Sequence, residues 1–321
     1  MIQKRVSVII PARNEKYLAA TVRDLLANAE GDLEILVFLE GPQPDPQLPT
    51  DPRVQAIWHA VPQGMRPCIN EGAARATGQY LLKCDAHCRF APGFDTALKA
   101  DCDRDWLVVP TRDSLDGETW ARKRRDYNYS ILTYPYLPSM YGEGLHAVTF
   151  PWDQNKTINA ARAHRKVDDL LSAQGSCWFQ HTQTFLDDGP LDHANLYFYQ
   201  ESQETMLRRW MRGGRCVVNK RTWYAHWHKG KESTGADGRP GRGYYLDLRK
   251  KRSSEAYSTD YWIHDRCPGA TRTFVSLIEQ FWPLIAEMTD PRYAWPADWR
   301  DFGKHRQAFY TRSPEQLPAH L

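Results

Sequence analysis

The fold is first indicated by the stretch Arg5-Val6-Ser7-Val8-Ile9-Ile10-Pro11-Ala12-Arg13-Asn14-Glu15. It begins with a short apolar run rich in β-branched side chains, which is typical of a strand buried inside a sheet. The run is too short for a signal peptide, and a polar loop starts at Pro11. Apolar residues then recur at helical spacing over residues 15–29. A buried strand, a loop and an amphipathic helix in this order predict the beginning of an α/β domain.

The alternation of strands and helices continues to about residue 110. Further strands are expected at residues 33–39, 54–58, 80–84 and 106–109, and a helix at 66–77. This order predicts a mostly parallel, Rossmann-like central sheet covered on both faces. In such sheets ligands bind at the carboxyl ends of the strands.

The second half of the chain is less regular. Residues 111–172 show no clear period. A helix is expected at residues 201–211, a strand at 221–228 and a Gly-rich basic loop at 229–243. An amphipathic helix is expected near residues 271–288, with a kink at Pro283.

Composition limits the class of protein. The 321 residues are 41% hydrophobic and 25% charged, which is ordinary for a globular protein of one large domain or two intimate ones. No segment approaches the roughly 18 apolar residues of a membrane span. The chain has seven cysteines, an odd number at irregular spacing, which favours reduced thiols and a cytoplasmic location. A viral protein that acts in the cytoplasm of its host would fit the same description.

The net charge of +3 is unevenly distributed. Residues 205–252 hold fourteen Lys and Arg against three acids, a net +11, which leaves −8 for the rest of the chain. Such a basic segment indicates an anionic partner, although it would also suit a solvated basic face. No protein partner is evident.

Cys84-Asp85-Ala86-His87-Cys88 follows the strand at 80–84 directly. In an extended backbone, residues two apart point to the same side, so Asp85 and His87 would project together at a strand's carboxyl end. A carboxylate and an imidazole suit Mn²⁺ or Mg²⁺, and such an ion could bridge a diphosphate. Two alternatives are a zinc site formed by Cys84, His87 and Cys88, and a plain surface pair of Asp85 and His87.

These residues resemble a known family. An Asp-X-His after a strand, followed by Cys, is similar to the metal motif of the polypeptide N-acetylgalactosaminyltransferases. These enzymes belong to the GT-A glycosyltransferases, which also include family 2. Residues 8–15 resemble the first strand and nucleotide loop of both families, residues 33–40 their second strand, and residues 72–78 the helix before the metal strand.

A second block of sequence extends the resemblance. Residues 175–179 and 185–192 are similar to an acceptor-side strand and its turn, and residues 201–214 to an acidic motif that runs into an Arg-X-Trp helix. His226 matches the third metal ligand of the N-acetylgalactosaminyltransferases, with His228 as the fallback.

The resemblance implies a set of site residues. The metal ligands would be Asp85, His87 and His226. Carboxylate chemistry would come from Glu201 and Glu204, because Ser202 stands where family 2 has an aspartate base; the glutamates could also only cap the following helix. The donor would contact residues that lie mostly in the loops, namely Pro11, Ala12, Arg13, Glu15, Glu40, Arg66, Asp85, Lys229 and Tyr244.

The sequence thus predicts a metal-dependent GT-A glycosyltransferase that uses a UDP-sugar, with retention favoured. Residues 1–110 would bind the nucleotide sugar, 111–262 would bind the acceptor and complete the metal site, and 263–321 would form a C-terminal helical extension. The basic segment suggests an acceptor polymer such as viral DNA with a hydroxymethylated base. Alternatives are a protein Ser/Thr or bacterial glycan or lipid acceptor, a nucleotidyltransferase, and a catalytically silent nucleotide-sugar-binding module.

Overall fold

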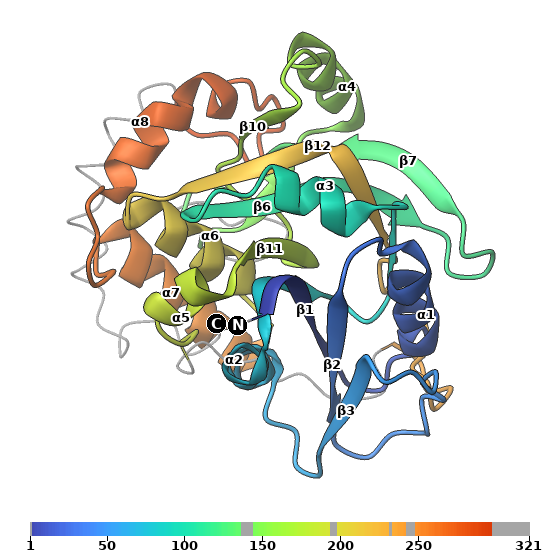
Figure 1. Ribbon diagram of the computed structural model, residues 1–321. Coiled ribbons are helices and arrows are strands. Elements are labelled where there is room, and N and C mark those ends of the chain that lie inside the picture. The colour runs from blue at the N-terminus through green and yellow to red at the C-terminus, as the bar shows by residue number, and fades with distance from the viewer. Residues whose placement is uncertain (1, 136–143, 193–197, 231–232, 242–247, 297–321) are drawn as a thin grey trace.

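A computed structural model describes residues 2–135, 144–192, 198–230, 233–241 and 248–296. Its centre is a ten-stranded sheet in which eight strands follow the order β10-β12-β6-β11-β4-β1-β2-β3 (Figure 1). Two short partners extend it, with β5 paired to β12 and β7 to β6. The strands of the main path are β1 (Ile2–Ala12), β2 (Leu33–Glu40), β3 (Val54–His59), β4 (Gly78–Cys84), β6 (Trp106–Leu115), β10 (Val167–Asp169), β11 (Cys177–His181) and β12 (Arg215–His226).

Four of the seven neighbouring pairs along this path are parallel. They are β12 with β6, β4 with β1, β1 with β2, and β2 with β3. The strand β11 runs antiparallel between β4 and β6, so that its first residue, Cys177, pairs with the last residue of β4, Cys84. The predicted α/β class with a mostly parallel central sheet is confirmed. The first residues of β11 therefore lie at the same edge as the carboxyl ends of the parallel strands.

Helices cover both faces of the sheet, as the alternating pattern predicts. On one face, α1 (Leu18–Asn28) neighbours α3 (Phe94–Ala100), and the backbone N–H of Glu30 donates to the Asp95 carboxylate. On the other face, α2 (Met65–Arg75) lies beside α5 (Thr182–Asp187) and α6 (Glu201–Met211). Close packing is visible at Gly72 of α2, where a Cβ would lie 2.8 Å from the Ile9 side chain in β1.

Residues 111–172, which the sequence left unassigned, contain short elements. The described ones are β7 (Arg122–Tyr127), β8 (Ser130–Leu132), β9 (Ala147–Thr149) and α4 (Trp152–Ala161), followed by β10. A buried aspartate, Asp168, joins them because its carboxylate accepts hydrogen bonds from Tyr129, Arg162 and Arg165. These contacts span up to 39 positions, so no local period could reveal them.

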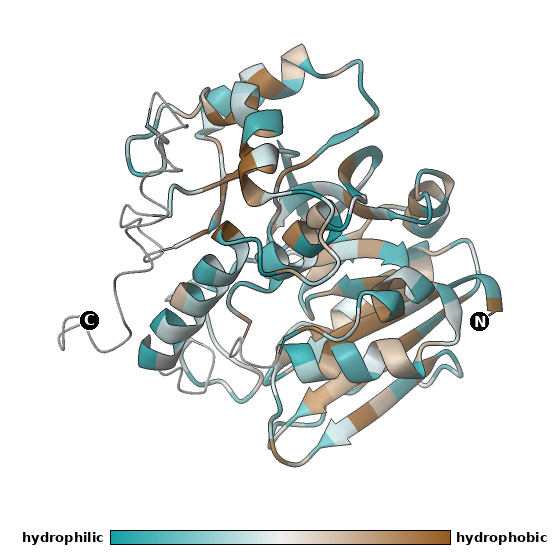
Figure 2. Cartoon of the chain, turned by 90° about the vertical axis from the view of Figure 1, so that its left-hand side faces the viewer, coloured by the Kyte–Doolittle hydropathy of each residue, from teal (hydrophilic) through white to brown (hydrophobic). Residues whose placement is uncertain are grey.

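The C-terminal part contains α7 (Leu248–Ile263) and α8 (Phe274–Ile285). Thr273 caps α8, because its Oγ1 accepts a hydrogen bond from the backbone N–H of Ser276. Pro283 lies in the last turn of this helix. The predicted divisions at residues 110 and 262 fall inside β6 and α7. Strands from both predicted halves therefore share one sheet, whose central strands are mostly hydrophobic (Figure 2).

Within the part of the chain that the structure describes, no helix combines the length and the apolar character needed to cross a bilayer.

Candidate active site

A cavity of about 350 Å³ lies at the carboxyl edge of the sheet, where the ends of β1, β2 and β4 meet the start of β11. Its walls come from the loop after β1, from residues 83–87, from residues 174–176, from the start of α6 and from the segment after β12. Its size lies in the range of small-molecule binding sites. The expectation that ligands bind at this edge of a parallel sheet agrees with this position.

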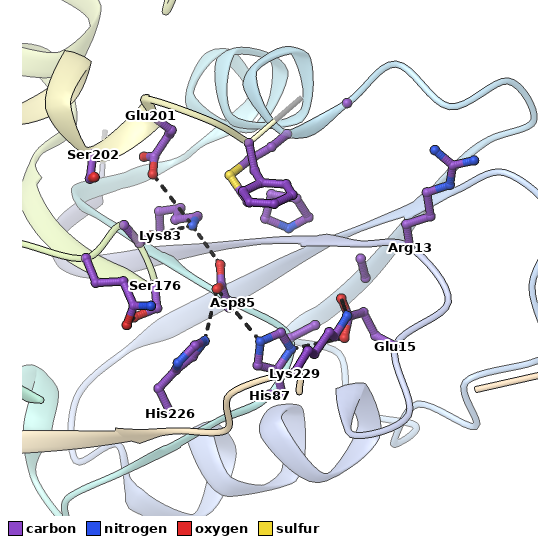
Figure 3. Close-up of a pocket in the computed structure, with 18 of the residues that line it drawn as sticks. Arg13, Glu15, Lys83, Asp85, His87, Ser176, Glu201, Ser202, His226 and Lys229 are labelled. Atoms are coloured by element: carbon purple, nitrogen blue, oxygen red, sulfur yellow. Dashed lines mark hydrogen bonds and ion pairs between the residues drawn. The ribbon is translucent and has the colours of Figure 1, made fainter. Parts of the chain in front are cut away.

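Three predicted metal ligands converge at one side of the cavity (Figure 3). The Nε2 atom of His226 lies 3.2 Å from Oδ2 of Asp85, and Nε2 of His87 lies 3.8 Å from the same oxygen. One ligand atom from each residue lies within 4.8 Å of the others. The structure therefore brings together the three side chains that the sequence analysis singled out as ligands.

The sequence analysis assumed an extended backbone at this motif, but the structure shows a different conformation. Asp85, Ala86 and His87 form a tight turn between β4 and β5 (Cys88–Phe90). The turn is fixed at both ends, because Asp85 N–H donates to the Ser176 carbonyl and Cys88 N–H donates to Thr21 Oγ1. The turn, rather than strand alternation, directs Asp85 and His87 to the same side.

The pairing of β5 with β12 brings His226 to the motif. His226 is opposite Cys88 in this antiparallel pair and opposite Ser114 in the parallel pair with β6. Its side chain is buried, and burial lowers the pKa of the imidazole to about 3. A neutral imidazole keeps a lone pair for an ion, which a protonated one would lack.

The orientation of His87 is set by Glu15. The Nδ1 atom of His87 lies 3.0 Å from Oε2 of Glu15, and Lys229 donates to the other carboxylate oxygen at 2.5 Å. Burial alone would raise the pKa of the Glu15 carboxyl, but His87 and Lys229 outweigh it and lower that pKa to about 2. A carboxylate that holds Nδ1 leaves Nε2 directed at Asp85, which is the usual arrangement behind a metal-bound histidine.

The donor set of one carboxylate and two imidazoles fits a divalent ion of the Mn²⁺ type. A zinc site that uses Cys84 and Cys88 fits poorly, because burial raises the pKa of both thiols well above the ordinary value. A second cluster of potential ligands is Glu40, His59 and Cys68. There the carboxylate of Glu40 is already bonded to His59 Nδ1 at 2.6 Å and to two backbone N–H groups.

Behind Asp85 lies a lysine that the sequence analysis did not single out. The Lys83 ammonium is fully buried and donates to Oδ1 of Asp85 at 2.8 Å. Burial would lower the pKa of Lys83, but Asp85 and Glu201 raise it, so the side chain stays charged. In turn Lys83 and the two histidines hold the pKa of Asp85 well below its usual range, against the effect of burial.

The two predicted acidic residues of α6 have different surroundings. Glu201 lines the cavity, and its Oε1 accepts a hydrogen bond from Trp178 Nε1 at 2.7 Å. Glu204 does not line this cavity and pairs instead with Arg66 at 2.7 Å, in a contact where both side chains are buried. Neither Arg66 nor Glu204 lines the cavity, because the two side chains pair with each other, so the donor-binding role of Arg66 and the acid–base role of Glu204 stay predictions.

Glu40 lines the cavity, but its carboxylate also organises the loop before α2. Oε2 accepts the N–H groups of Gln63 and Gly64, and Gly64 has a backbone φ of 100°, which favours glycine. The predicted contact of Glu40 with the nucleotide would compete with these bonds.

Residues 233–241, which belong to the predicted basic loop at 229–243, dock on the loop after β1. Asn14 donates from Nδ2 to Asp237 at 2.9 Å, and Asp237 N–H donates back to Asn14 Oδ1 at 3.0 Å. Gly235 allows this approach, since a Cβ there would lie 2.2 Å from Nδ2 of Asn14. Tyr244 lies outside the described residues.

The basic segment at residues 205–252 does not form one charged face. Most of its described cations have partners within the chain: Arg209 and Arg212 pair with Asp188, Arg215 with Asp169, Arg221 with Asp101, Lys229 with Glu15, Arg239 with Asp237 and Lys251 with Glu255. The sequence-based argument for a polyanionic partner from this segment is thereby weakened.

Ten of the predicted site residues line the cavity, namely Pro11, Ala12, Arg13, Glu15, Glu40, Asp85, His87, Glu201, His226 and Lys229. The sequence analysis did not predict several others, among them Lys83, Gly175, Ser176, Tyr199 and Gln200. A signal for Lys83 was present, because a lysine at the end of the apolar run at residues 80–84 is unusual for a buried strand.

Comparisons with known proteins show which proteins this chain resembles. Residues 7–159 match the sequence model "Glycosyl transferase family 2". Among solved structures, GalNAc-T7 with UDP, GalNAc and Mn²⁺ is similar with a TM-score of 0.63 and 17% identity over 88% of this chain and 57% of that one. The chain thus spans little more than half the length of that relative.

TarS from S. aureus is also similar. The complex of its residues 1–349 with UDP-GlcNAc gives a TM-score of 0.54 and 11% identity, with 93% of this chain and 77% of that chain covered. At such identities the likeness establishes the fold. The chain therefore has the GT-A fold, and it resembles the family 2 glycosyltransferases over residues 7–159 and GalNAc-T7 in its overall structure.

Proposed function

We propose that this protein transfers a sugar from a UDP-sugar to an acceptor hydroxyl, with Mn²⁺ or Mg²⁺ held by Asp85, His87 and His226. The single observation that carries the proposal is the convergence of these three side chains at the wall of a cavity whose opposite wall holds Glu201 (Figure 3). The UDP donor is supported by GalNAc-T7, which was crystallised with UDP and Mn²⁺, and by TarS, which was crystallised with UDP-GlcNAc.

The residues of the cavity divide between the parts of such a donor. Arg13 lies at the far end from Glu201, with Pro11, Ala12 and Glu40 also in the wall, and would contact the nucleotide. Lys229 and His228 lie beside the predicted ligands and would face the diphosphate. A bound divalent ion would neutralise charge on the departing diphosphate. Glu201 would then touch the transferred sugar.

We further propose that the sugar is a hexose or N-acetylhexosamine and that its anomeric configuration is retained. The resemblance to the N-acetylgalactosaminyltransferases at Glu201 and Glu204 supports retention. The ion pair between Arg66 and Glu204 supports it too, because a carboxylate held in this pair is a poor general base. In this route an oxygen of the leaving diphosphate takes the proton of the acceptor hydroxyl, so that no separate protein base is required. NMR analysis of the product's anomeric proton tests the stereochemistry.

The donor assignment is tested by a thermal-shift screen of nucleotide sugars with and without Mn²⁺. Binding to the native state alone raises the melting temperature by mass action. We expect UDP-sugars to raise it only when the metal is present, and EDTA to reverse the effect. Absence of any shift with every nucleotide sugar and metal would reject the assignment.

For the acceptor we propose an anionic polymer, with a hydroxymethylated base in viral DNA as the leading example. The support now comes from the surface beside α4 rather than from residues 205–252. The exposed Trp152 on α4 has the guanidinium of Arg125 5.0 Å from the centroid of its ring. Cations with an exposed aromatic ring suit phosphates and a displaced base.

The acceptor proposal is tested with duplex DNA that carries hydroxymethylcytosine, in parallel with a Ser/Thr peptide and a bacterial glycan or lipid intermediate. Glucosylated or N-acetylhexosaminylated DNA and a steep loss of binding with salt are expected. Transfer only to the peptide or glycan would instead support one of those acceptors.

A catalytically silent nucleotide-sugar-binding module is the alternative of another class. The absence of an aspartate at Ser202 favours it. Metal-dependent release of UDP from a UDP-sugar, even to water, would exclude it. The seven cysteines, all free and buried, support a reducing, cytoplasmic setting for either function.

A further inference from the structure

Lys83 lies between the predicted metal carboxylate and Glu201, in the deepest wall of the cavity (Figure 3). Its side chain is only 1% exposed. The Nζ atom donates to Oδ1 of Asp85 at 2.8 Å and to the carbonyl of Gly175 at 2.5 Å. Because an ammonium carries three N–H groups, one donor remains after these two bonds. Within the described residues, no further acceptor lies at hydrogen-bond distance from Nζ.

Glu201 presents a matching acceptor on the other side of the same space. Its Oε1 is occupied by Trp178 Nε1, whereas Oε2 has no hydrogen-bond donor among the described residues. Oε2 lies 4.0 Å from Nζ of Lys83, too far for a direct hydrogen bond. Gly175 keeps this space open, because a Cβ at that position would lie 2.1 Å from Oε2.

The separation of the two groups fits one bridging oxygen atom. An oxygen can lie about 2.8 Å from both atoms when they are 4.0 Å apart. A hydroxyl can accept from the ammonium and donate to the carboxylate at once. A phosphate or carbonyl oxygen has no proton for Glu201, and an N–H group cannot accept from Lys83. A water molecule meets both requirements, and among the groups of a nucleotide sugar only a hydroxyl does.

The place of this pair along the cavity identifies whose hydroxyl it is. Asp85 turns Oδ2 toward the two imidazoles and Oδ1 toward Lys83. If the diphosphate lies on the imidazole side, the group attached to it reaches the Lys83 side. We propose that Lys83 is a specificity-determining residue which, with Glu201, binds one hydroxyl of the transferred sugar. The inference rests on the proposed UDP-sugar function.

The test compares binding of UDP with binding of UDP-GlcNAc, UDP-GalNAc and UDP-glucose by calorimetry in Mn²⁺, for the native protein and for Lys83→Met. The variant keeps the length of the side chain but cannot donate. Because Lys83 also pairs with Asp85, the measure is the difference between the two losses: we expect the affinity for the preferred UDP-sugar to fall about 10- to 100-fold more than the affinity for UDP, the usual range for a charged hydrogen bond. Lys99→Met is the matched control, since it removes another Lys–Asp pair, with Asp95, outside the cavity.

Monodeoxy UDP-sugars identify the hydroxyl. One deoxy analogue is expected to bind the native protein more weakly than its parent but to bind Lys83→Met as well as the parent does. Equal losses of UDP and UDP-sugar affinity in Lys83→Met would overturn the proposal, because they would mean a role in the metal site or the fold. The proposal would also be overturned if every deoxy analogue lost the same affinity, relative to its parent UDP-sugar, in the native protein and in Lys83→Met.

If Lys83→Met does not fold, Glu201→Gln carries the same comparison, since the amide that replaces Oε2 can no longer accept from the hydroxyl. Failure of the native protein to bind either UDP or any UDP-sugar would reject the proposed function itself. Native binding with an unchanged sugar preference in both variants would reject only the role of Lys83.

Discussion

Nε2 of His226 lies 3.2 Å from Oδ2 of Asp85, although 141 positions separate the two residues. The contact arises because β5 follows the Asp85–His87 turn directly and pairs with the end of β12. Two sequence segments that are each unremarkable thus form one binding site. This relationship makes the metal-dependent proposals testable with single substitutions.

Replacing Asp85 with Asn should abolish the Mn²⁺-dependent part of UDP-sugar binding, because the neutral amide is a poor ligand and Lys83 loses its ionic partner. At a ligand concentration 100-fold above Kd, about 2.7 kcal/mol of stabilisation would be lost. Thermal-shift titration measures this. His226→Ala should also remove the Mn²⁺-dependent thermal shift. His164→Ala is the control, since this histidine is exposed, and it should show the same shift as the native protein. A full Mn²⁺ response in Asp85→Asn would contradict the assigned ligand set.

Glu15→Gln should weaken metal binding about 10- to 100-fold without removing a ligand. Glu15 holds Nδ1 of His87 and pairs with Lys229, and loss of such an orienting carboxylate usually has this effect. Titration of free Mn²⁺ by electron paramagnetic resonance gives the affinity directly. An unchanged Mn²⁺ affinity would mean that His87 does not need this partner or is not a ligand.

Gly175→Ala should lower donor turnover at least 10-fold, because the new Cβ would lie 2.1 Å from the Glu201 carboxylate and displace it. We expect a stability cost of about 1 to 3 kcal/mol, as for other insertions into packed sites. UDP release and urea unfolding measure the two effects. Gly230→Ala is the control, since a Cβ there meets nothing within 4 Å. Native turnover in Gly175→Ala would show that the site tolerates movement of Glu201.

Glu204→Gln should destabilise the fold by about 3 to 5 kcal/mol, because it leaves the buried guanidinium of Arg66 without its ionic partner. Turnover per folded molecule should remain within a few-fold of the native value, since Glu204 does not line the cavity. Denaturant unfolding and UDP release separate the two quantities. A folded Glu204→Gln protein without turnover would restore the predicted acid–base role of Glu204.

Asp168 should contribute stability that disappears in acid. Burial would raise the pKa of its carboxyl, but hydrogen bonds from Tyr129, Arg162 and Arg165 lower it below the ordinary value of 3.8. Because the folded pKa is below the unfolded one, the stabilisation is complete above the unfolded pKa of about 4 and is lost as the pH falls through the folded value.

Asp168→Asn should therefore reduce the free energy of unfolding by about 1 to 3 kcal/mol at neutral pH, and the difference from the native protein should shrink as the pH falls below about 4. Urea unfolding at several pH values measures it. Asp153→Asn, at an aspartate that is 95% exposed, should show no difference at any pH. A constant difference in Asp168→Asn would mean that the carboxylate's charge is not the source of its effect.

The sequence by itself determined the parallel strands, the helices α1, α2 and α6, and the position of Asp85 and His87 directly after a strand, but not the turn that these residues form. Each of these follows from a local period of apolar residues or from a short motif, and local backbone preferences are enough to form them. The predicted helix at residues 201–211 coincides with α6, which ends just before Gly213 and Gly214, although every residue of this helix is buried. By contrast, residues 111–172 are held by distant polar contacts such as that of Tyr129 with Asp168, which leave no period in the sequence.

Only the tertiary structure decided which charged side chains face the cavity. Glu201 and Glu204 are three positions apart on one helix, yet one reaches the cavity and the other is occupied by Arg66, 138 positions away. Likewise Lys83 is a lone lysine in an apolar strand until the pairing of β4 with β11 brings the Gly175 carbonyl to its ammonium. The partner of a buried charge is set by the register and packing of distant segments, and the residues next to it in the chain do not encode that choice.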